Sequence, residues 1–253
     1  MAAGDASVAA WLSALETRHL ADLRPVEVAR ALRALSSAYV ERRDRLGHGA
    51  ALDGAGKRAA FALFYGPLHF LVVRAIVRAI PAAEGPLDLV VDLGCGTGVA
   101  GAAWAVECAA RPRVLGLERH PWAADEARWT CRTLGVAADV RCVDIARMRV
   151  PPRASAIIAA FTVNELADAT RAQLLRELLA FGSRGTRVLV VEPIAKSNAP
   201  WWAGWQGAFV QAGGREDQWR FPADLPAVVG RLDHAAGLDH RELTARSLYL
   251  ANR

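Results

Sequence analysis

The sequence predicts an α/β fold, in which helices cover both faces of an open, mostly parallel sheet and further helices form a cap at the N-terminus. Residues 87–93 are apolar apart from two aspartates, as expected of a parallel strand covered on both faces. A glycine-rich turn follows, from Gly94 to Gly98, and a helix begins at once from Val99. Strands and helices then alternate, which is typical of right-handed crossovers in a doubly wound sheet.

The N-terminal third has helical periodicity. Apolar residues at helical spacing predict one helix near Val8 and another that begins at Pro25. A loop rich in Gly and Ala, residues 47–56, then precedes a third helix, which we expect to break at Gly66-Pro67 before it resumes. A linker composition at residues 81–86 divides the chain into a helical cap (residues 1–85) and an α/β domain (residues 86–253).

The α/β domain is expected to contain short apolar strands separated by helices. The strands are expected at residues 87–93, 113–118, 138–143, 154–161 and 187–191. The helices are expected at residues 99–110, 121–134 and 171–181. Nearer the C-terminus, residues 225–236 look helical and residues 242–250 look like an edge strand, and the pattern makes no full seventh strand evident.

Composition narrows the class of protein. The chain has 253 residues, of which 53% are hydrophobic and 23% charged, as in soluble globular proteins. No signal peptide is expected at its start, and the long apolar stretch at residues 61–80 is interrupted by His69, Arg74 and Arg78, so we expect no membrane span. The four cysteines have no paired spacing, which argues against a metal site and disulfides and favours a reducing, cytoplasmic location.

Basic residues outnumber acidic ones and give a net charge of +5. Nearly all of the 31 basic residues are arginines, which fits phosphate recognition but equally fits a GC-biased coding sequence. No basic run is longer than Arg42-Arg43, so no nucleic-acid-binding tail is evident.

Acidic residues end the predicted strands beside the glycine turn. Glu118 ends the second strand, where a carboxylate can accept hydrogen bonds from both hydroxyls of a ribose. Asp144 follows the third strand, where it can bind the exocyclic amine of an adenine. Asp92 precedes the turn, where an acid would repel a pyrophosphate but suits a cationic amino-acid group. A dinucleotide-dependent oxidoreductase would share the first two features, but Asp92 disfavours it.

Asp92-Leu-Gly-Cys-Gly-Thr-Gly98, Glu118 and Asp144 resemble, in order and spacing, the cofactor motifs of class I S-adenosylmethionine-dependent methyltransferases. The resemblance covers about residues 86–251 and implies a seven-stranded, Rossmann-like sheet that binds S-adenosylmethionine and releases S-adenosylhomocysteine (SAH). It implies that the Gly94–Gly98 loop holds the methionine part, Glu118 the ribose and Asp144 the adenine. The cofactor-binding residues expected on this basis are Asp92, Gly94, Cys95, Gly96, Gly98, Glu118, Arg119, Asp144, Ile145 and Phe161.

A narrower resemblance rests on residues ahead of the glycine turn. Residues 35–42 (Leu-Ser-Ser-Ala-Tyr-Val-Glu-Arg) and the stretch from Tyr65 to Phe70 look like the helical lead-in of the ribosomal small-subunit methyltransferase-like family, and residues 164–166 and 192–193 look similar to its strand ends. Mitochondrial members of that family associate with the assembling small ribosomal subunit. This chain departs from the family because it is short and lacks the cysteine-rich segment that carries a metal cluster in some members, so a metabolite acceptor fits equally well.

The catalytic candidates lie beyond the fourth strand and in the cap. Asn164 can orient a donor and Glu165 can take a proton or bind a cationic acceptor, although the same pair also fits a helix N-terminus. Tyr65 and His69 flank Gly66-Pro67 and can reach over the cofactor, although both also fit ordinary core positions. The tryptophans at 201, 202, 205 and 219 can form an aromatic wall around a planar acceptor or simply pack a loop on the sheet.

We therefore expect a methyltransferase enzyme whose small-molecule acceptor binds between the helical cap and the sheet. The alternative is an rRNA methyltransferase or an assembly factor of the small ribosomal subunit that binds S-adenosylmethionine. The methyl on a sulfonium is already activated, so the protein must chiefly hold the acceptor close and aligned. No metal site is expected, and the sequence leaves the acceptor atom and the oligomeric state open.

Overall fold

A computed structural model describes residues 2–41, 52–147, 149–194 and 199–251. Part of the expected loop at residues 47–56, and Arg42 of the narrower resemblance, lie outside these residues. The strands are β1 Leu89–Leu93, β2 Arg113–Glu118, β3 Ala138–Cys142, β4 Ala156–Ala160, β5 Arg187–Glu192, β6 Arg215–Pro222 and β7 Glu242–Leu250. The α-helices are α1 Ala2–His19, α2 Pro25–Glu41, α3 Ala55–Ala60, α4 Gly66–Ala79, α5 Val99–Glu107, α6 Pro121–Thr133, α7 Asp168–Gly182, α8 Trp202–Gln211 and α9 Ala227–Ala236.

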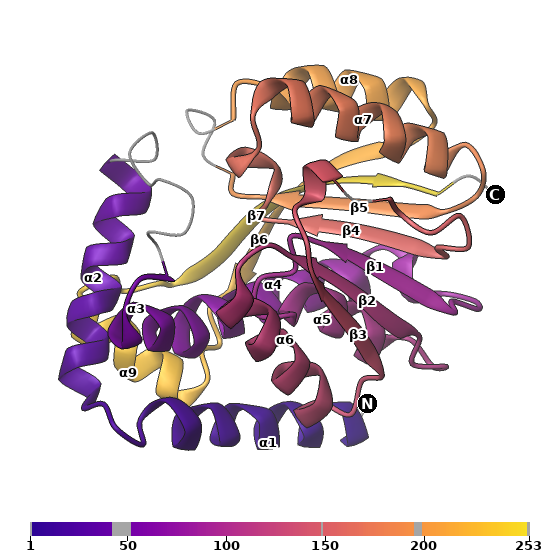
Figure 1. The fold of residues 1–253 in the computed structure, drawn as a ribbon. Coiled ribbons are helices and arrows are strands. Elements are labelled where there is room, and N and C mark those ends of the chain that lie inside the picture. The colour runs from indigo at the N-terminus through magenta and orange to yellow at the C-terminus, as the bar shows by residue number, and fades with distance from the viewer. Residues whose placement is uncertain (1, 42–51, 148, 195–198, 252–253) are drawn as a thin grey trace.

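All seven strands belong to one sheet in the order β3-β2-β1-β4-β5-β7-β6 (Figure 1). The strands β1 to β5 are parallel, and β7 and β6 are antiparallel to their neighbours. Asp92 is level with Gly116 on β2 and with Ile158 on β4, so the ends of these three strands lie at one edge of the sheet. The predicted fold class, a doubly wound and mostly parallel sheet, is confirmed.

Two expectations near the C-terminus were wrong. β7 is not an edge strand, because it lies between β5 and β6 and pairs Glu192 with Arg246. The edge strand is β6, for which the sequence pattern gave no clear sign. Its side chains are mostly polar and alternate between exposed and half-buried, so the apolar run that marks a buried strand is missing.

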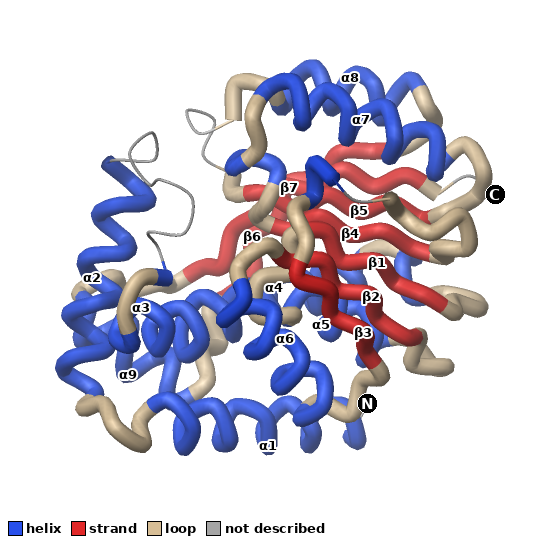
Figure 2. Tube along the Cα trace, in the orientation of Figure 1, coloured by secondary structure: helices blue, strands red, loops and turns tan. Residues whose placement is uncertain are grey.

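Helices cover both faces of the sheet (Figure 2). On one face α7 and α8 pack on an apolar core that includes Leu93, Ile157 and Phe209. On the other face α4 and α5 pack on a larger core that includes Val90 and Trp104 and extends into the N-terminal helices. The Rossmann-like layer arrangement therefore leaves only the two ends of the strands open to ligands.

The expected break at Gly66-Pro67 is absent. Residues Phe61–Tyr65 form a π-helix, and the Gly66 N–H donates to the Phe61 carbonyl one residue further back than in an α-helix. The wider turn accommodates Pro67, which has no N–H and would clash with a carbonyl of a regular helix. The helix therefore runs from Ala55 to Ala79. It is apolar and long enough to cross a membrane, but 72% of its apolar 18-residue window is buried inside the structure, as in a core helix.

The N-terminal helices are attached to the domain from two sides. The buried carboxylate of Glu126 on α6 accepts hydrogen bonds from Arg18 (3.1 Å) and pairs with His19 (2.8 Å), both at the end of α1. On the other side α9 packs against α2, although it belongs to the C-terminal part of the chain. The division into a cap and an α/β domain stays a prediction, and α9 joins the cap in space.

Candidate active site

The glycine turn links β1 to α5 and presents its backbone to a cavity. Gly94, Gly96 and Gly98 all have left-handed φ angles, of 64°, 52° and 80°. A Cβ added to Gly98 would meet the backbone and side chain of Ala127 at 2.9–3.2 Å, so this glycine allows α6 to approach closely. A Cβ added to Gly96 would meet only the Phe61 ring, at 3.9 Å, so Gly96 faces open space where a ligand can contact the peptide groups.

Asp92 lies behind the turn, not in the cavity. Its carboxylate is 1% exposed and accepts a hydrogen bond of 2.7 Å from the Gly101 N–H at the start of α5. Burial raises the pKa of Asp92 to about 7. The nearby Glu118 carboxylate also raises it, whereas the hydrogen bond from Gly101 lowers it. Asp92 therefore contacts the backbone at the start of α5 from the core side and does not line the cavity.

Glu118 connects the end of β2 to the glycine turn. Its two carboxylate oxygens accept hydrogen bonds from the Gly96 N–H (2.9 Å) and from the His120 N–H (2.8 Å). The side chain is half-buried and lines the cavity, so it holds the turn in shape and keeps acceptor capacity toward a ligand. Asp144, beyond β3, also lines the cavity, and it accepts a hydrogen bond from the Ala146 N–H at 2.9 Å.

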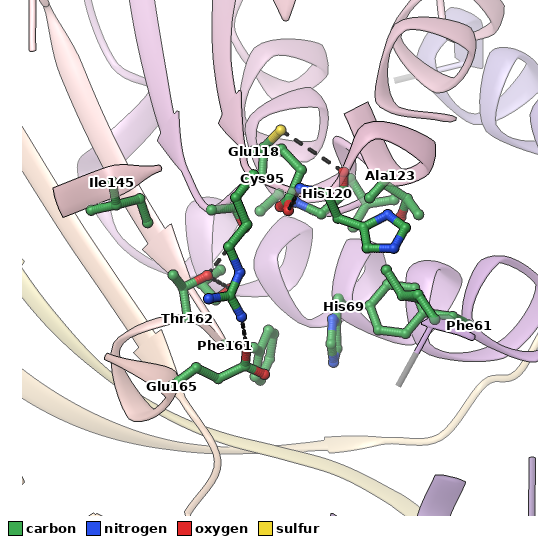
Figure 3. Close-up of a pocket in the computed structure, with 18 of the residues that line it drawn as sticks. Phe61, His69, Cys95, Glu118, His120, Ala123, Ile145, Phe161, Thr162 and Glu165 are labelled. Atoms are coloured by element: carbon green, nitrogen blue, oxygen red, sulfur yellow. Dashed lines mark hydrogen bonds and ion pairs between the residues drawn. The ribbon is translucent and has the colours of Figure 1, made fainter. Parts of the chain in front are cut away.

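The cavity has a volume of about 340 Å³ and lies between the strand ends and the cap helix. In Figure 3, Cys95, Glu118 and His120 lie on one side, and Phe61, His69 and Phe161 lie on the other. The expected site residues that line it are His69, Gly94, Cys95, Gly96, Glu118, Arg119, Asp144, Ile145, Phe161 and Glu165. Those that do not line it are Tyr65, Asp92, Gly98 and Asn164.

The wall opposite the glycine turn is aromatic. Phe61 belongs to the π-helix, His69 to α4, and Phe161 follows β4, and we call these three residues the aromatic wall. The rings of His69 and Phe161 stack with centroids 3.8 Å apart and planes 15° apart. Phe161 has a φ angle of 57°, which is strained for a bulky residue, and burial lowers the pKa of His69 to about 3.

Tyr65 lies one turn behind the aromatic wall. Its ring contacts those of Phe61 and His69, with centroids 5.9 and 6.1 Å away. Burial raises the pKa of Tyr65 to about 12, against the smaller effect of a hydrogen bond with Ser36, so the phenol keeps its proton at neutral pH. The structure therefore brings Tyr65 to the back of His69 and not to the cavity.

Glu165 and Asn164 have separate environments although they are adjacent. Glu165 lines the cavity, and its carboxylate lies 4.0 Å from the Arg119 guanidinium across the opening. Asn164 points away, donates from Nδ2 to Glu192 at 2.7 Å and accepts from the Trp201 indole at 2.8 Å. Because α7 begins only at Asp168, Asn164 is not a helix cap, and its contacts hold the turn that carries Glu165.

The tryptophans pack in the core and do not form the wall that the sequence allowed. Trp202 and Trp205 are buried between α8 and the sheet, and Trp201 packs against the same core. Trp219 on β6 donates to the Ser247 hydroxyl at 2.8 Å. Among the described residues that line the cavity, the aromatic ones are Phe61, His69, His120 and Phe161.

Sequence reasoning missed several cavity residues. Thr162 donates from Oγ1 to the Gly94 carbonyl at 3.1 Å and packs tightly over that glycine. Thr97, inside the glycine turn, has a buried hydroxyl with no partner among the described residues, and its place in the motif was the available signal. Phe61 was also missed, because its approach to Gly96 joins two residues that are distant in sequence and leaves no local signal.

Comparisons with known proteins agree with this geometry. Residues 90–183 match the model of a methyltransferase domain family. The fold is similar to that of the mitomycin 7-O-methyltransferase MmcR (16% identity, TM-score 0.53, covering 95% of this chain and 72% of that one). It is also similar to the plantazolicin methyltransferase BpumL in complex with a triazolic desmethylPZN analog and SAH (12% identity, TM-score 0.52, covering 90% and 98%). A SAM-dependent methyltransferase from Aquifex aeolicus is similar over 73% of this chain and 92% of its own (15% identity, TM-score 0.50).

A search of curated proteins finds no match to the sequence. The family match and the shared fold nevertheless agree with the class that the motifs predicted: residues 90–183 match a methyltransferase domain, and the fold is shared with S-adenosylmethionine-dependent methyltransferases. The enzyme class that the three motifs predicted is thereby confirmed.

Proposed function

We propose that the chain transfers the methyl group of S-adenosylmethionine to a small-molecule acceptor bound between the cap helix and the sheet. The observation that carries the proposal is that Gly96, Glu118 and Asp144, from three separate strand ends, line the same cavity as the aromatic wall. One side of the cavity thus suits an adenosyl amino acid, and the other side offers apolar rings to an acceptor.

The residues present fit the donor. Space in front of Gly96 lets a ligand approach the backbone of the turn, whose Gly96 N–H donates to Glu118, and Thr97 lines the same cavity. Glu118 would bind the ribose, and Asp144 with Ile145 the adenine. When bound, S-adenosylmethionine supplies a methyl group on a sulfonium. BpumL crystallised with SAH, and MmcR, a mitomycin 7-O-methyltransferase, support this donor and a small-molecule or peptide acceptor.

Binding and alignment of the acceptor are the main task of this chain's own residues. A proton must also leave when the acceptor atom is protonated. His69, with a pKa of about 3, is too weak a base at neutral pH, although its ring can accept a hydrogen bond. Glu165 lines the cavity and lies beside Phe161 of the aromatic wall in Figure 3, and it is the residue we assign to proton acceptance.

The proposal is tested by calorimetry of S-adenosylmethionine binding to the whole chain and to Glu118→Ala. Loss of the carboxylate removes hydrogen bonds to a charged group, so binding should weaken about 10- to 100-fold. Glu84→Ala is the matched control, because Glu84 is exposed on the linker before β1. Wild-type affinity in Glu118→Ala would remove the ribose assignment, and no binding to the wild type would remove the proposal.

The RNA or ribosome alternative predicted from the sequence stays a prediction. Against it stands the charge of the cavity, which is lined by the carboxylates of Glu118, Asp144 and Glu165 and by the single guanidinium of Arg119 among the described residues. An acceptor rich in phosphate would need the opposite balance. Binding of labelled single-stranded RNA with a steep salt dependence would favour the alternative.

A further inference from the structure

We infer that the acceptor presents an uncharged, planar aromatic or heteroaromatic ring, which stacks on the aromatic wall of Phe61, His69 and Phe161. The inference rests on the proposed function and names the class of acceptor for that same cavity. It is carried by the geometry of the wall, by the strain at Phe161 and by the distribution of charge around the cavity.

The wall is built from rings that are already stacked. His69 and Phe161 come from two separate elements, one from α4 and one from the end of β4, and their parallel contact of 3.8 Å joins the cap to the sheet. Phe61 lies beside Gly96, with its ring edge 3.9 Å from the position that a Cβ would take. Figure 3 shows the three rings along one side of the cavity, so a flat group can lie against them by offset stacking.

The backbone at Phe161 is held in an unfavourable conformation. A φ of 57° is unfavourable for a bulky residue, and such strain persists where the surrounding structure over-determines it. Here the Phe161 N–H donates to the Val191 carbonyl at 2.8 Å while its ring stacks on His69. The strain thus aims the ring at the cavity opposite the glycine turn and not into the core below β4.

The charge of the cavity lining disfavours anionic acceptors. Burial keeps His69 neutral, so the wall itself carries no charge. The three carboxylates in the lining, against one guanidinium, repel phosphorylated or carboxylated acceptors. A cation at the reacting atom would have no lone pair for the methyl group. What remains is a neutral nucleophile, and the rings favour an aromatic one.

The volume of the cavity limits the thickness of the acceptor. A volume of about 340 Å³ is near the lower end for ligand sites, so a bound donor leaves room only for a thin group. A flat ring presents its reactive atom edge-on toward the glycine turn while its face contacts Phe61 or Phe161. A saturated ring of the same atoms is thicker and has no π-face.

The test measures binding of three matched probes to the full-length protein saturated with SAH, by calorimetry and ligand-observed NMR. The probes are 2-naphthol (flat and neutral), decahydro-2-naphthol (saturated and neutral) and 2-naphthoate (flat and anionic). We expect 2-naphthol to bind and the other two to bind at least about tenfold more weakly, or not at all. Equal binding of the saturated alcohol, or preference for the anion, would overturn the inference.

Variants locate the bound probe. Phe161→Leu and Phe61→Leu keep apolar volume but remove a π-face, so each should weaken 2-naphthol binding about two- to tenfold. Phe181→Leu is the matched control, because Phe181 lies at the end of α7 in the core on the opposite face of the sheet. If the control variant also loses binding, or if neither Phe161→Leu nor Phe61→Leu weakens it, the probe does not bind at the aromatic wall. Absence of SAH binding would instead refute the proposed function.

Discussion

The carboxylate of Asp92 is expected to make the folded chain less stable as the pH rises. In the native state burial raises its pKa to about 7, whereas the ordinary pKa of an aspartate is 3.8. The native state therefore holds a proton that the unfolded chain releases, and the stability that this proton provides is complete below pH 3.8 and is lost as the pH approaches 7. Replacing Asp92 with Asn removes the titration, while the amide oxygen can still accept the hydrogen bond from Gly101.

The magnitude follows from the two pKa values. Between pH 5 and pH 8 the wild type should lose about 2–3 kcal/mol of unfolding free energy through this group, and Asp92→Asn should lose none of it. The amide also buries an additional N–H₂ group, and the cost of that change does not depend on pH. The informative quantity is therefore a double difference in unfolding free energy: variant minus wild type at pH 8, minus variant minus wild type at pH 5.

The assay is urea unfolding of the cofactor-free protein at both pH values. The relative stability of Asp92→Asn should rise by about 2–3 kcal/mol from pH 5 to pH 8. Asp88→Asn is the control, because Asp88 is exposed just before β1, at the opposite end of the strand, and its difference from wild type should not change. A pH-independent difference for Asp92→Asn would show that the carboxylate is not buried as described and would refute the reasoning.

Two further variants report on the cavity and on the glycine turn. Burial lowers the pKa of His69 to about 3, whereas the ordinary pKa of a histidine is 6.5, so the unfolded chain takes up a proton that the native state does not and stability falls as the pH falls. His69→Phe keeps the stack on Phe161 and should remove about 2 kcal/mol of the stability lost between pH 7 and pH 5 in urea titrations. An unchanged acid dependence would contradict this expectation. In thermal unfolding, Gly98→Ala should destabilise the chain more than Gly185→Ala. Both glycines have a positive φ, but only a Cβ at Gly98 would clash with another residue, Ala127. Equal effects of the two variants would mean that α6 can move away.

The sequence was sufficient for the parallel half of the sheet and for the strand-end residues that line one side of the cavity. Parallel strands buried on both faces appear as apolar runs, and each ends in a polar residue at the same edge, so β1 to β5 and the positions of Glu118 and Asp144 could be read locally. Gly94 to Gly98 belonged to the same local pattern. Interactions between near neighbours in sequence were enough for this part.

The acceptor side depends on contacts between distant segments. His69 and Phe161 stack although 92 residues separate them, and nothing near either position in the sequence indicates the contact. The edge strand β6 lacked an apolar pattern because half of its side chains face solvent. The clustering of tryptophans in the sequence allowed an aromatic wall around an acceptor, but Trp202 and Trp205 pack in the core between α8 and the sheet.

The π-helix at Phe61–Tyr65 has a consequence for how this pocket can change. Eight residues of α-helix would place Phe61 and His69 about 80° apart, but one extra residue in the wide turn makes the spacing equivalent to seven, which leaves them about 20° apart on one face. Deleting a residue within the π-turn would restore a regular helix and keep both rings in register. An insertion between the turn and His69 would swing Phe61 by about 100° out of the cavity. Acceptor preference in this chain can therefore be altered by helix length, without exchanging any ring.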